Sequence, residues 1–382
     1  MRSSEMSQLH EEGRRRLDII RDQMRTRNLD ALLIYSQRRG HVSYVSGYHP
    51  NYHTNSAAIV MPAREAPVLM VKFGFDLARA RSVSWIEDVR PSKQESQDGM
   101  VQTCHEVLRE KNLERARIGL VARDETIDEM SLSLFESLRE RLAEARIESA
   151  SDLVNSMRLR KSSSEIARIR RATEIAESAG ETLRSFILPG NEDYLATAHA
   201  AMTAHALGAE RCDAITSVSP ANLAYPPAHR HFVRGNPVSC ELTVQYEGYW
   251  VQICRTFSLG EPSPKQRRIF LTACNAYEKA LGMCYPGNSV ARIAIAAVEE
   301  VDRAGYSGCI RYGLGHGIGL DLPEPYSVDL HSKETLASGA VLVVHIGIWV
   351  EGEGAAFVGG PIAIDTQGAT VLDHPQREMA VL

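Results

Sequence analysis

The chain has 382 residues, of which 44% are hydrophobic and 24% are charged, and its formal net charge is −5. This length favours two domains, the composition is typical of a soluble globular protein, and the absence of a concentrated basic tract excludes nucleic acid as an expected partner. No secretory signal or membrane span is expected, since the longest apolar run, residues 339–350, is short and contains His345.

Helical and strand patterns alternate along the first 157 residues. Apolar side chains recur at helical spacing between Glu11 and Asn28. Apolar runs predict short buried strands, and two charged stretches predict helices. The strands are expected at residues 29–36, 57–62, 67–72 and 117–122, and the helices at residues 101–116 and 132–147. This alternation predicts a compact α/β domain over residues 1–157.

The remainder, residues 158–382, reads as a second domain that begins with a long helix. Ser162 to Ser164, followed by Glu165, resembles a helix N-terminus with a serine cap and an acid in the first turn. Further helices are expected at residues 194–207, 264–283 and 290–305, and strands at residues 241–247, 250–259, 339–350, 355–364 and 369–372. Two helices leading into a hairpin, followed by two more leading into strands, predict a duplicated half.

A histidine lies within a run of glycines in the stretch RYGLGHGIGLDLPEP, residues 311–325. Glycines in a strand indicate a bulge or the close approach of another backbone. His316 is therefore expected beside such a bulge, with Glu324 shortly after it. The seven cysteines are scattered and form no CxxC pair, so a reducing, cytoplasmic location is expected.

Four motifs in order resemble the pita-bread superfamily of creatinase, aminopeptidase P, prolidase and methionine aminopeptidase. They are GYWVQICRTFSLGEPSPKQ (248–266), YPG (285–287), GLGHGIGLDLPEP (313–325) and GAVLVVHIGIWV (339–350). The stretch LDALLIYSQRRGHVSYVSGY resembles the smaller domain of the creatinase and prolidase branch. The resemblance implies an α/β (α+β) protein with a creatinase-type N-terminal domain (1–157) and a pita-bread domain (158–382). It also implies a homodimer that acts on a small molecule, with the N-terminal domain of one subunit near the other's pocket.

The resemblance implies a metal site that this sequence has largely lost. Peptidases of the superfamily hold two divalent metals with two aspartates, a histidine and two glutamates, because paired hard cations need bridging carboxylates. Glu241 and Gln252 fall at the aspartates, His316 at the histidine, His345 at the first glutamate, and Gly359 at or beside the last. An ordinary dinuclear aminopeptidase P or prolidase is therefore not expected.

The first of three interpretations is a hydrolase without metal or other cofactor, in the manner of creatinase, that cleaves a C–N bond in a small polar substrate; a lyase is compatible with the same residues. His316 and His345 would transfer protons, and Glu241 and Glu324 would orient the substrate or provide charge. Creatine itself is a poor candidate, since creatinase's catalytic histidine falls at Ala224 or Tyr225 and its guanidino-binding glutamate at Cys254. The substrate-binding candidates are Gln252, Cys254, Tyr225, His229, His231, Tyr52 and His53.

Two other interpretations stay open. Glu241, His316 and His345 form a two-histidine, one-carboxylate set that suits a single divalent metal such as zinc, iron or manganese. The third interpretation is a pita-bread protein that has lost its chemistry and serves as a binding module. Against this last interpretation, a cavity without a ligand would be expected to fill with apolar side chains, because unpaired buried polar groups are costly.

Overall fold

The computed structural model describes the chain except residues 1–2, 38–39, 51–54, 123–128 and 219–224. The chain divides into two compact units, Met1–Arg158 and Leu159–Leu382, and each is described by itself. Within the described residues, no helix is both long enough and apolar enough to cross a membrane.

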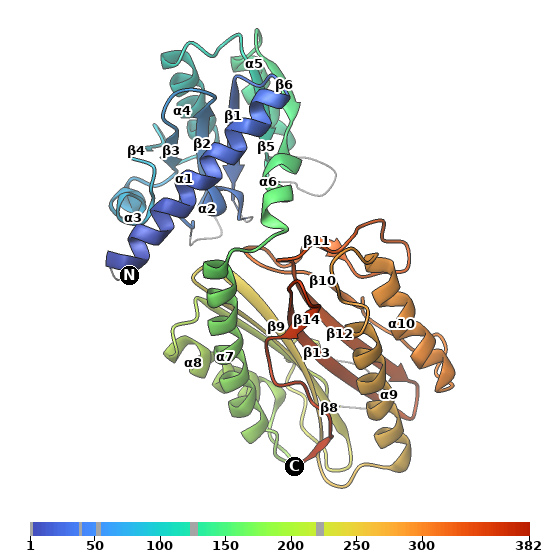
Figure 1. The fold of residues 1–382 in the computed structure, drawn as a ribbon. Helices are drawn as coiled ribbons and strands as arrows, with labels where there is room; N and C mark the ends of the chain where they lie inside the picture. The colour runs from blue at the N-terminus through green and yellow to red at the C-terminus, as the bar shows by residue number, and fades with distance from the viewer. Residues whose placement is uncertain (1–2, 38–39, 51–54, 123–128, 219–224) are drawn as a thin grey trace. The chain divides into compact units, whose positions relative to one another are not determined.

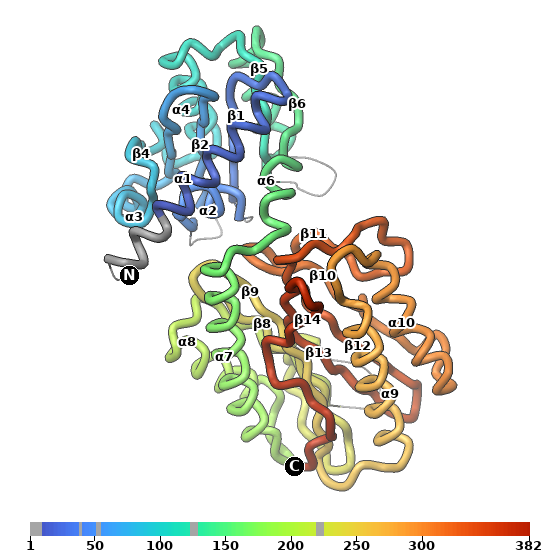
Figure 2. Tube along the Cα trace, viewed as in Figure 1, coloured from blue at the N-terminus to red at the C-terminus, as the bar shows by residue number. Residues whose placement is uncertain are grey.

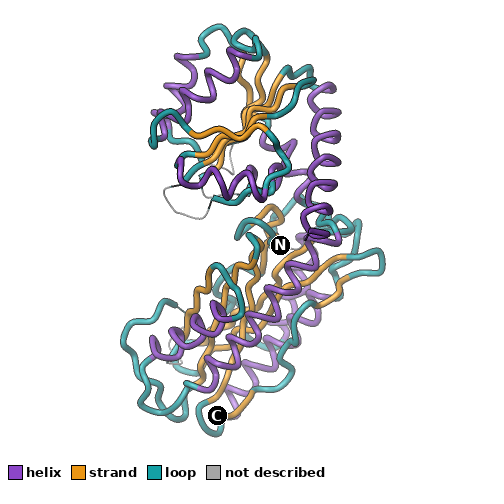
Figure 3. The backbone as a smooth tube through the Cα atoms, turned by 90° about the vertical axis from the view of Figure 1, so that its left-hand side faces the viewer, coloured by secondary structure: helices purple, strands orange, loops and turns teal. Residues whose placement is uncertain are grey.

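The N-terminal unit is built on a six-stranded mixed sheet with the strand order β4-β3-β2-β1-β5-β6. Its strands are β1 (Ala31–Ser36), β2 (Ala57–Pro62), β3 (Val68–Val71), β4 (Asp88–Pro91), β5 (Arg117–Val121) and β6 (Arg146–Ser149). The helices are α1 (Ser3–Thr26), α2 (His41–Ser46), α3 (Leu77–Val83), α4 (Gln97–Glu110), α5 (Leu132–Arg141) and α6 (Ser151–Arg158), with a 3₁₀ turn at Gly74–Asp76. Helices lie on both sides of this sheet (Figure 3), as expected for continuously apolar strands such as β1 and β2.

One element of this unit differs from the prediction. The helix predicted over residues 132–147 ends at Arg141, and β6 begins at Arg146. Strand β6 pairs in parallel with β5, placing Ile147 beside Ile118. Pairing with a neighbouring strand therefore overrides the local helical pattern, which a sequence window cannot detect.

The C-terminal unit is built on a nine-stranded sheet whose main path runs β11-β10-β12-β13-β9-β8-β7. Its strands are β7 (Arg211–Thr216), β8 (Pro237–Tyr246), β9 (Tyr249–Ser258), β10 (Gly315–Gly317), β11 (Glu324–Ser327), β12 (Val341–Val350), β13 (Gly354–Ile364), β14 (Ala369–Val371) and β15 (Ala380–Val381). The helices are α7 (Ser163–Ser185), α8 (Asp193–Ala206), α9 (Pro264–Leu281) and α10 (Val290–Arg303). Strands β9 and β13, far apart in sequence, lie side by side (Figure 2).

The first helix of this unit begins as the sequence predicts. The Ser162 hydroxyl accepts a hydrogen bond from the Glu165 backbone N–H, and the Glu165 carboxylate accepts one from the Ser162 N–H, which is a capping box. The predicted duplication is also present. Helices α7 and α8 precede the β8–β9 hairpin, and α9 and α10 precede the β12–β13 hairpin.

The two faces of the nine-stranded sheet have different surroundings. Helices α7 and α9 pack on β8, β9, β12 and β13 from one side, which we call the helix-covered face (Figure 1). Val344, Ile346 and Val358 point to this side and pack with α9 and α10. Because side chains alternate along a strand, the residues between them point to the opposite face. That opposite face carries the candidate site.

Candidate functional site

Four neighbouring strands bring the central residues of the site into one row. Glu241 on β8 pairs with Cys254 on β9, Cys254 pairs with Gly359 on β13, and Gly359 pairs with His345 on β12. Residues paired across strands share a face. The sequence-predicted positions Glu241, Cys254, Gly359 and His345 therefore lie on the same face, opposite the helices.

His316 reaches this face from β10. It pairs with Val343, two residues before His345 on β12, so both imidazoles point to the same side, with ring centroids 6.0 Å apart. The pairing of β10 with β11 shifts between His316 and Gly317, which confirms the bulge predicted from the glycines. A Cβ atom on Gly317 would lie 1.9 Å from the carbonyl oxygen of Pro325, so only glycine permits this approach.

Gln252 connects Glu241 to His316. Its side-chain oxygen Oε1 lies 3.0 Å from His316 Nε2. Its amide also lowers the pKa of the Glu241 carboxyl, against the larger effect of burial. His316 Nδ1 lies 2.9 Å from the carbonyl oxygen of Gly317. Since a carbonyl only accepts, Nδ1 carries a proton, and the chemistry of Nε2 is directed toward the amide of Gln252.

The side chains of Glu241, Gln252 and His316 can share one proton in two forms. In one form, Gln252 donates from its NH₂ group to ionised Glu241 and accepts from the His316 imidazolium. In the other, the amide is rotated, protonated Glu241 donates to Gln252, and Gln252 donates to neutral His316. Burial raises the pKa of Glu241 to about 6 and lowers the pKa of His316. Each form holds one titrating proton, on His316 in the first form and on Glu241 in the second.

His345 has a different character from His316. It is 4% exposed, its ring packs edge-on against Phe357, and its Nδ1 atom is buried without a hydrogen-bond partner among the described residues. Burial, together with the neighbouring His316, lowers the pKa of His345 to about 3. His345 is therefore neutral near pH 7, which makes it a hydrogen-bonding group rather than a carrier of protons.

Gly359 leaves no room for a side chain beside His345. Its φ angle is +149°, and a Cβ atom there would lie 2.3 Å from the carbonyl oxygen of Val344 and 2.7 Å from the Cβ atom of His345. The backbone and side chain of His345 thus fill the space where another residue at position 359 would project. A carboxylate cannot be accommodated at Gly359 in this arrangement.

Cys254 lies between Glu241 and Gly359 in the row of paired strand residues. Its thiol is fully buried against Ala355 and Phe357, and burial raises its pKa well above the usual value. A thiol in this environment is not ionised near neutral pH. Cys254 is therefore a packing residue of the site, and it lacks the thiolate that a nucleophile requires.

Glu324 is engaged in a buried ion pair. Its carboxylate accepts a hydrogen bond from Lys161 Nζ at 2.5 Å, and both side chains are almost fully buried. The Asp321 backbone N–H donates to the same carboxylate. This bonding ties β11 to the segment before α7 and gives Glu324 a structural contact; its expected catalytic role stays a prediction.

Of the upstream candidates, His229 and His231 lie at the start of α8, and Tyr225 pairs with Thr216 at the end of β7. His229 and His231 are exposed and lie 3.4 and 3.8 Å from the carboxylate oxygens of Glu192. The guanidinium of Arg230 covers the ring of Tyr225 at 3.6 Å. None of these contacts joins the three predicted substrate-binding residues to Glu241, Gln252 or His316.

Two predicted substrate-binding residues of the N-terminal unit, Tyr52 and His53, lie outside the described residues. Tyr48 is fully buried, and its hydroxyl donates to Asp76, so it belongs to the core of that unit and cannot line a pocket. The ring of His49 hydrogen-bonds Ser43 at 2.9 Å.

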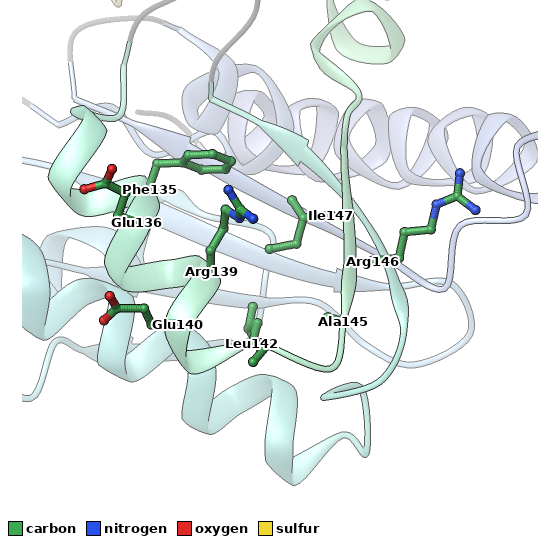
Figure 4. A pocket seen from close by; sticks show the side chains of 9 residues that line it. Phe135, Glu136, Arg139, Glu140, Leu142, Ala145, Arg146 and Ile147 are labelled. Carbon is green, nitrogen blue, oxygen red and sulfur yellow. The ribbon is translucent and has the colours of Figure 1, made fainter.

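The N-terminal unit carries a groove of about 800 Å³ (Figure 4). Its lining includes Phe135, Leu142 and Ile147, with Glu136, Glu140 and Arg139 around them. None of the predicted site residues contributes to it. We therefore place the candidate site on the row of the C-terminal unit, where hydrogen-bonded titratable groups converge.

Known proteins resemble the chain over both units. Residues 167–365 match the family model described as "Metallopeptidase family M24", and residues 16–160 match the model of the creatinase/prolidase N-terminal domain. The first of these matches covers more than half of the chain. The chain belongs to metallopeptidase family M24. Its fold class, an α/β protein with a creatinase-type N-terminal domain before a pita-bread domain, is thereby confirmed.

The chain has relatives in M24 that are named as dipeptidases. It is 26% identical over 254 residues to an "Xaa-Pro dipeptidase" of Pyrococcus furiosus, covering 65% of this chain and 73% of that protein. It is 24% identical over 348 residues to a "Putative dipeptidase YkvY" of Bacillus subtilis, covering 89% and 93%. The solved prolidase of Pyrococcus horikoshii OT3 superposes with a TM-score of 0.84 at 24% identity, covering 96% and 99%.

The side chains present do not fit the two-metal centre that an M24 peptidase implies. Among the five positions, Glu241 supplies the only carboxylate, and Gly359 cannot carry another. Within the described residues, no three histidine, cysteine, aspartate or glutamate side chains are grouped so as to hold a metal ion. Two adjacent divalent cations need bridging carboxylates, and this donor set does not provide them.

Two residues near the predicted site residues were not predicted from the sequence. Tyr312 lies four residues before His316, and its ring packs on Phe357 at 5.0 Å. Its position directly before the glycine-rich stretch was the available signal. Lys161 pairs with Glu324 across 163 positions of sequence, and no local pattern reveals such a contact.

Proposed function

We propose that this M24 protein hydrolyses a C–N bond in a small polar substrate without a dinuclear metal centre, and that His316 moves the proton. The observation that carries the proposal is the contact of Gln252 with His316 Nε2 at 3.0 Å, on the face that carries Glu241, at positions where the family's peptidases are expected to hold metals. Membership of a family of hydrolases supports the reaction class.

The mechanism assigns separate roles to the polar side chains. Neutral His316, oriented by its Nδ1 bond to Gly317, takes a proton from a water that replaces the Gln252 amide at Nε2. The hydroxide forms a bond to the carbon of the substrate's C–N group. The imidazolium then returns the proton to the leaving nitrogen as the C–N bond breaks, so that water is added across that bond and His316 is regenerated. Glu241 supplies negative charge, and His345 stays neutral as a hydrogen-bonding group.

The second candidate is a metal-dependent Xaa-Pro dipeptidase. The names of the relatives favour it, including the 26% identical protein of Pyrococcus furiosus. This candidate requires a metal centre that the side chains at Glu241, Gln252 and Gly359 do not supply in the family's expected way. The two candidates therefore make opposite predictions about metals.

An assay of two compound sets separates them. The first set holds small amides, amidines and cyclic lactams, assayed with a chelator present; the second holds Xaa-Pro dipeptides, assayed with added manganese, cobalt or zinc. The proposal predicts turnover in the first set that the chelator leaves unchanged. Turnover confined to the metal-supplemented dipeptides would overturn it, and so would no turnover in either set.

Two histidine variants identify the residue responsible. His316→Ala is expected to reduce turnover by about 10²–10⁴-fold, the usual effect of losing a general acid–base. His331→Ala is the matched control, since His331 is exposed on the loop after β11. Equal activities of the two variants would remove His316 from the mechanism.

A further inference from the structure

Strand β6 forms one edge of the six-stranded sheet in the N-terminal unit, beside the groove of Figure 4. The backbone N–H groups of Arg146 and Ala150 donate to the β5 side of the strand, at 3.0 and 2.9 Å. Since backbone groups alternate in direction along a strand, the N–H and C=O of Ile147 point away from β5. Within the described residues, neither group of Ile147 has a hydrogen-bond partner. An edge of this kind can pair with a further strand.

The other edge of the same sheet, strand β4, offers fewer pairing groups. The Ser92 N–H donates to Val71 on β3, so the backbone groups of Val89 and Pro91 point outward. The guanidinium of Arg81 donates to the carbonyl oxygen of Val89 at 3.2 Å, and a proline has no N–H to donate. The edge at β4 is therefore partly blocked by its own side chains, whereas the described residues leave the edge at β6 open.

The groove places apolar surface next to this open edge. Phe135 on α5 and Ile147 on β6 both line it, and both are half-buried against the core of the N-terminal unit. Figure 4 shows the two side chains extending toward each other between α5 and β6. A strand added at β6 would cover their exposed parts, and burial of apolar surface favours such an association.

The charges of β6 are complementary to those of a second copy of the same strand. Arg146 and Glu148 lie on one face of β6, and Ile147 lies on the other. In an antiparallel pair of two β6 strands about a two-fold axis through Ile147, each Arg146 lies opposite Glu148 of the other copy. Axes through Arg146 or Glu148 would instead place like charges opposite each other. Within one chain the two side chains are 3.8 Å apart and the arginine is 72% exposed, so Arg146 is available for the second copy.

We propose that β6 is an interaction surface for a second copy of this chain, and that an antiparallel β6–β6 pair joins the two six-stranded sheets into one. The two copies exchange the backbone hydrogen bonds of Ile147 and cover the exposed parts of Phe135 and Ile147. Each Arg146 pairs with Glu148 of the other copy. The inference does not depend on the proposed function, because no residue of the candidate site takes part.

Disulfide cross-linking tests the register of this pair. Arg146→Cys/Glu148→Cys places thiols at opposed positions, where a Cα separation of about 4.5 Å suits a disulfide. After mild oxidation of the full chain, peptide mapping is expected to find a covalent dimer linked from position 146 of one copy to position 148 of the other. Asp88→Cys/Arg90→Cys, with the same spacing on β4, is the matched control and should give no such dimer. No covalent dimer from the β6 variant, or an equal yield from the β4 variant, would overturn the proposal.

Charge reversal tests the complementarity without new thiols. Sedimentation equilibrium at low ionic strength gives the dissociation constant of the dimer. Arg146→Glu and Glu148→Arg each place like charges opposite each other at two positions, so each should weaken the dimer by about tenfold. The double variant Arg146→Glu/Glu148→Arg should restore the wild-type constant, and Arg25→Glu, at an exposed arginine of α1, should not change it. A monomeric wild-type protein, a dimer that both single variants leave intact, or a double variant no tighter than the single ones would overturn the proposal.

Discussion

The two faces of the nine-stranded sheet treat buried charge in opposite ways. On the helix-covered face, Arg255 donates to Asp373 at 2.8 Å and to the carbonyl oxygens of Cys254 and Gly359. On the opposite face, Glu241 accepts a hydrogen bond from the Thr243 hydroxyl at 3.5 Å and has no ion pair within the described residues, and His345 Nδ1 is buried without a described partner. Adjacent residues of one strand, Cys254 and Arg255, thus belong to two different environments.

This difference separates stability from function within the same strands. On the helix-covered face the charge of Asp373 is paired with Arg255 and the apolar residues pack on α9 and α10, although Asp373 Oδ1 and the Tyr277 hydroxyl have no described partner. The opposite face holds a buried carboxylate, Glu241, without a described cation and a buried imidazole atom, His345 Nδ1, without a described partner, and such groups reduce stability. Substitutions on the first face should therefore destabilise the fold, whereas selected substitutions on the second should stabilise it.

The largest expected effect is on the helix-covered face. Arg255→Ala leaves the buried carboxylate of Asp373 without its cation, and we expect a loss of about 3–5 kcal/mol in the free energy of unfolding. Urea unfolding measures it. Arg377→Ala is the control, because Arg377 is exposed and its ion pair with Glu278 is long, at 3.9 Å. If Arg255→Ala lost no more free energy of unfolding than the control, the Arg255–Asp373 pair would not stabilise this face.

Gly359→Ala tests the space beside His345. The new Cβ atom would overlap the backbone of Val344 and His345 in a left-handed conformation, so we expect a loss of roughly 2–4 kcal/mol. Gly287→Ala separates the two causes, since Gly287 has φ +85° and nothing within 4 Å of an added Cβ atom. The control should lose only about 1–2 kcal/mol. Equal losses would remove the steric part of the explanation.

The acid sensitivity of the fold should depend on His345. Its pKa is about 3 in the folded protein and 6.5 as the ordinary value, so the unfolded chain binds the extra proton. The contribution to stability is complete above pH 6.5 and is lost as the pH falls toward 3, by about 2 kcal/mol between pH 7 and pH 5. His345→Leu should flatten this part of the stability profile measured by urea unfolding, whereas His331→Leu should not. A steep acid limb in His345→Leu would contradict the assignment.

Glu241 should have the opposite sign and the smallest effect. Its pKa rises from 4.5 to about 6 on folding, so its protonated form is favoured in the folded state. Stability is then greatest below pH 4.5 and falls as the pH rises through 6. Glu241→Gln cannot ionise and should be more stable than wild type at pH 7.5 by about 1–2 kcal/mol. Thermal unfolding would detect the gain, and Glu299→Gln, an exposed acid on α10, should show none. A loss of stability in Glu241→Gln would contradict the expectation that substitutions on this face can stabilise the fold.

Much of the fold could be predicted because its signals are local or belong to ordered motifs. The cap at Ser162, the long apolar strands β12 and β13, and the glycine bulge at His316 each depend on a few neighbouring residues. Strands β6, β10 and β11 are short and are defined by pairing with distant segments, so no period in the sequence identifies them.

The site could be predicted in part for the same reason. The motifs located Glu241, Gln252, His316 and His345, and strand pairing brings them to one face. The motifs could not reveal the partners. The bond from Lys161 to Glu324 and the packing of Tyr312 on Phe357 both join residues that are distant in sequence. The different protonation of His316 and His345 depends on burial, which only the folded structure defines.

The most direct test of the central claim is the metal content of the protein, purified without chelators and without a metal-affinity step. Elemental analysis gives the equivalents of zinc, iron, manganese and cobalt per chain, alongside an assay of turnover on the same sample. A single carboxylate among the five positions predicts metal well below one equivalent per chain in an active preparation. About two equivalents per chain, with activity that a chelator abolishes, would contradict the account and establish an ordinary dinuclear peptidase.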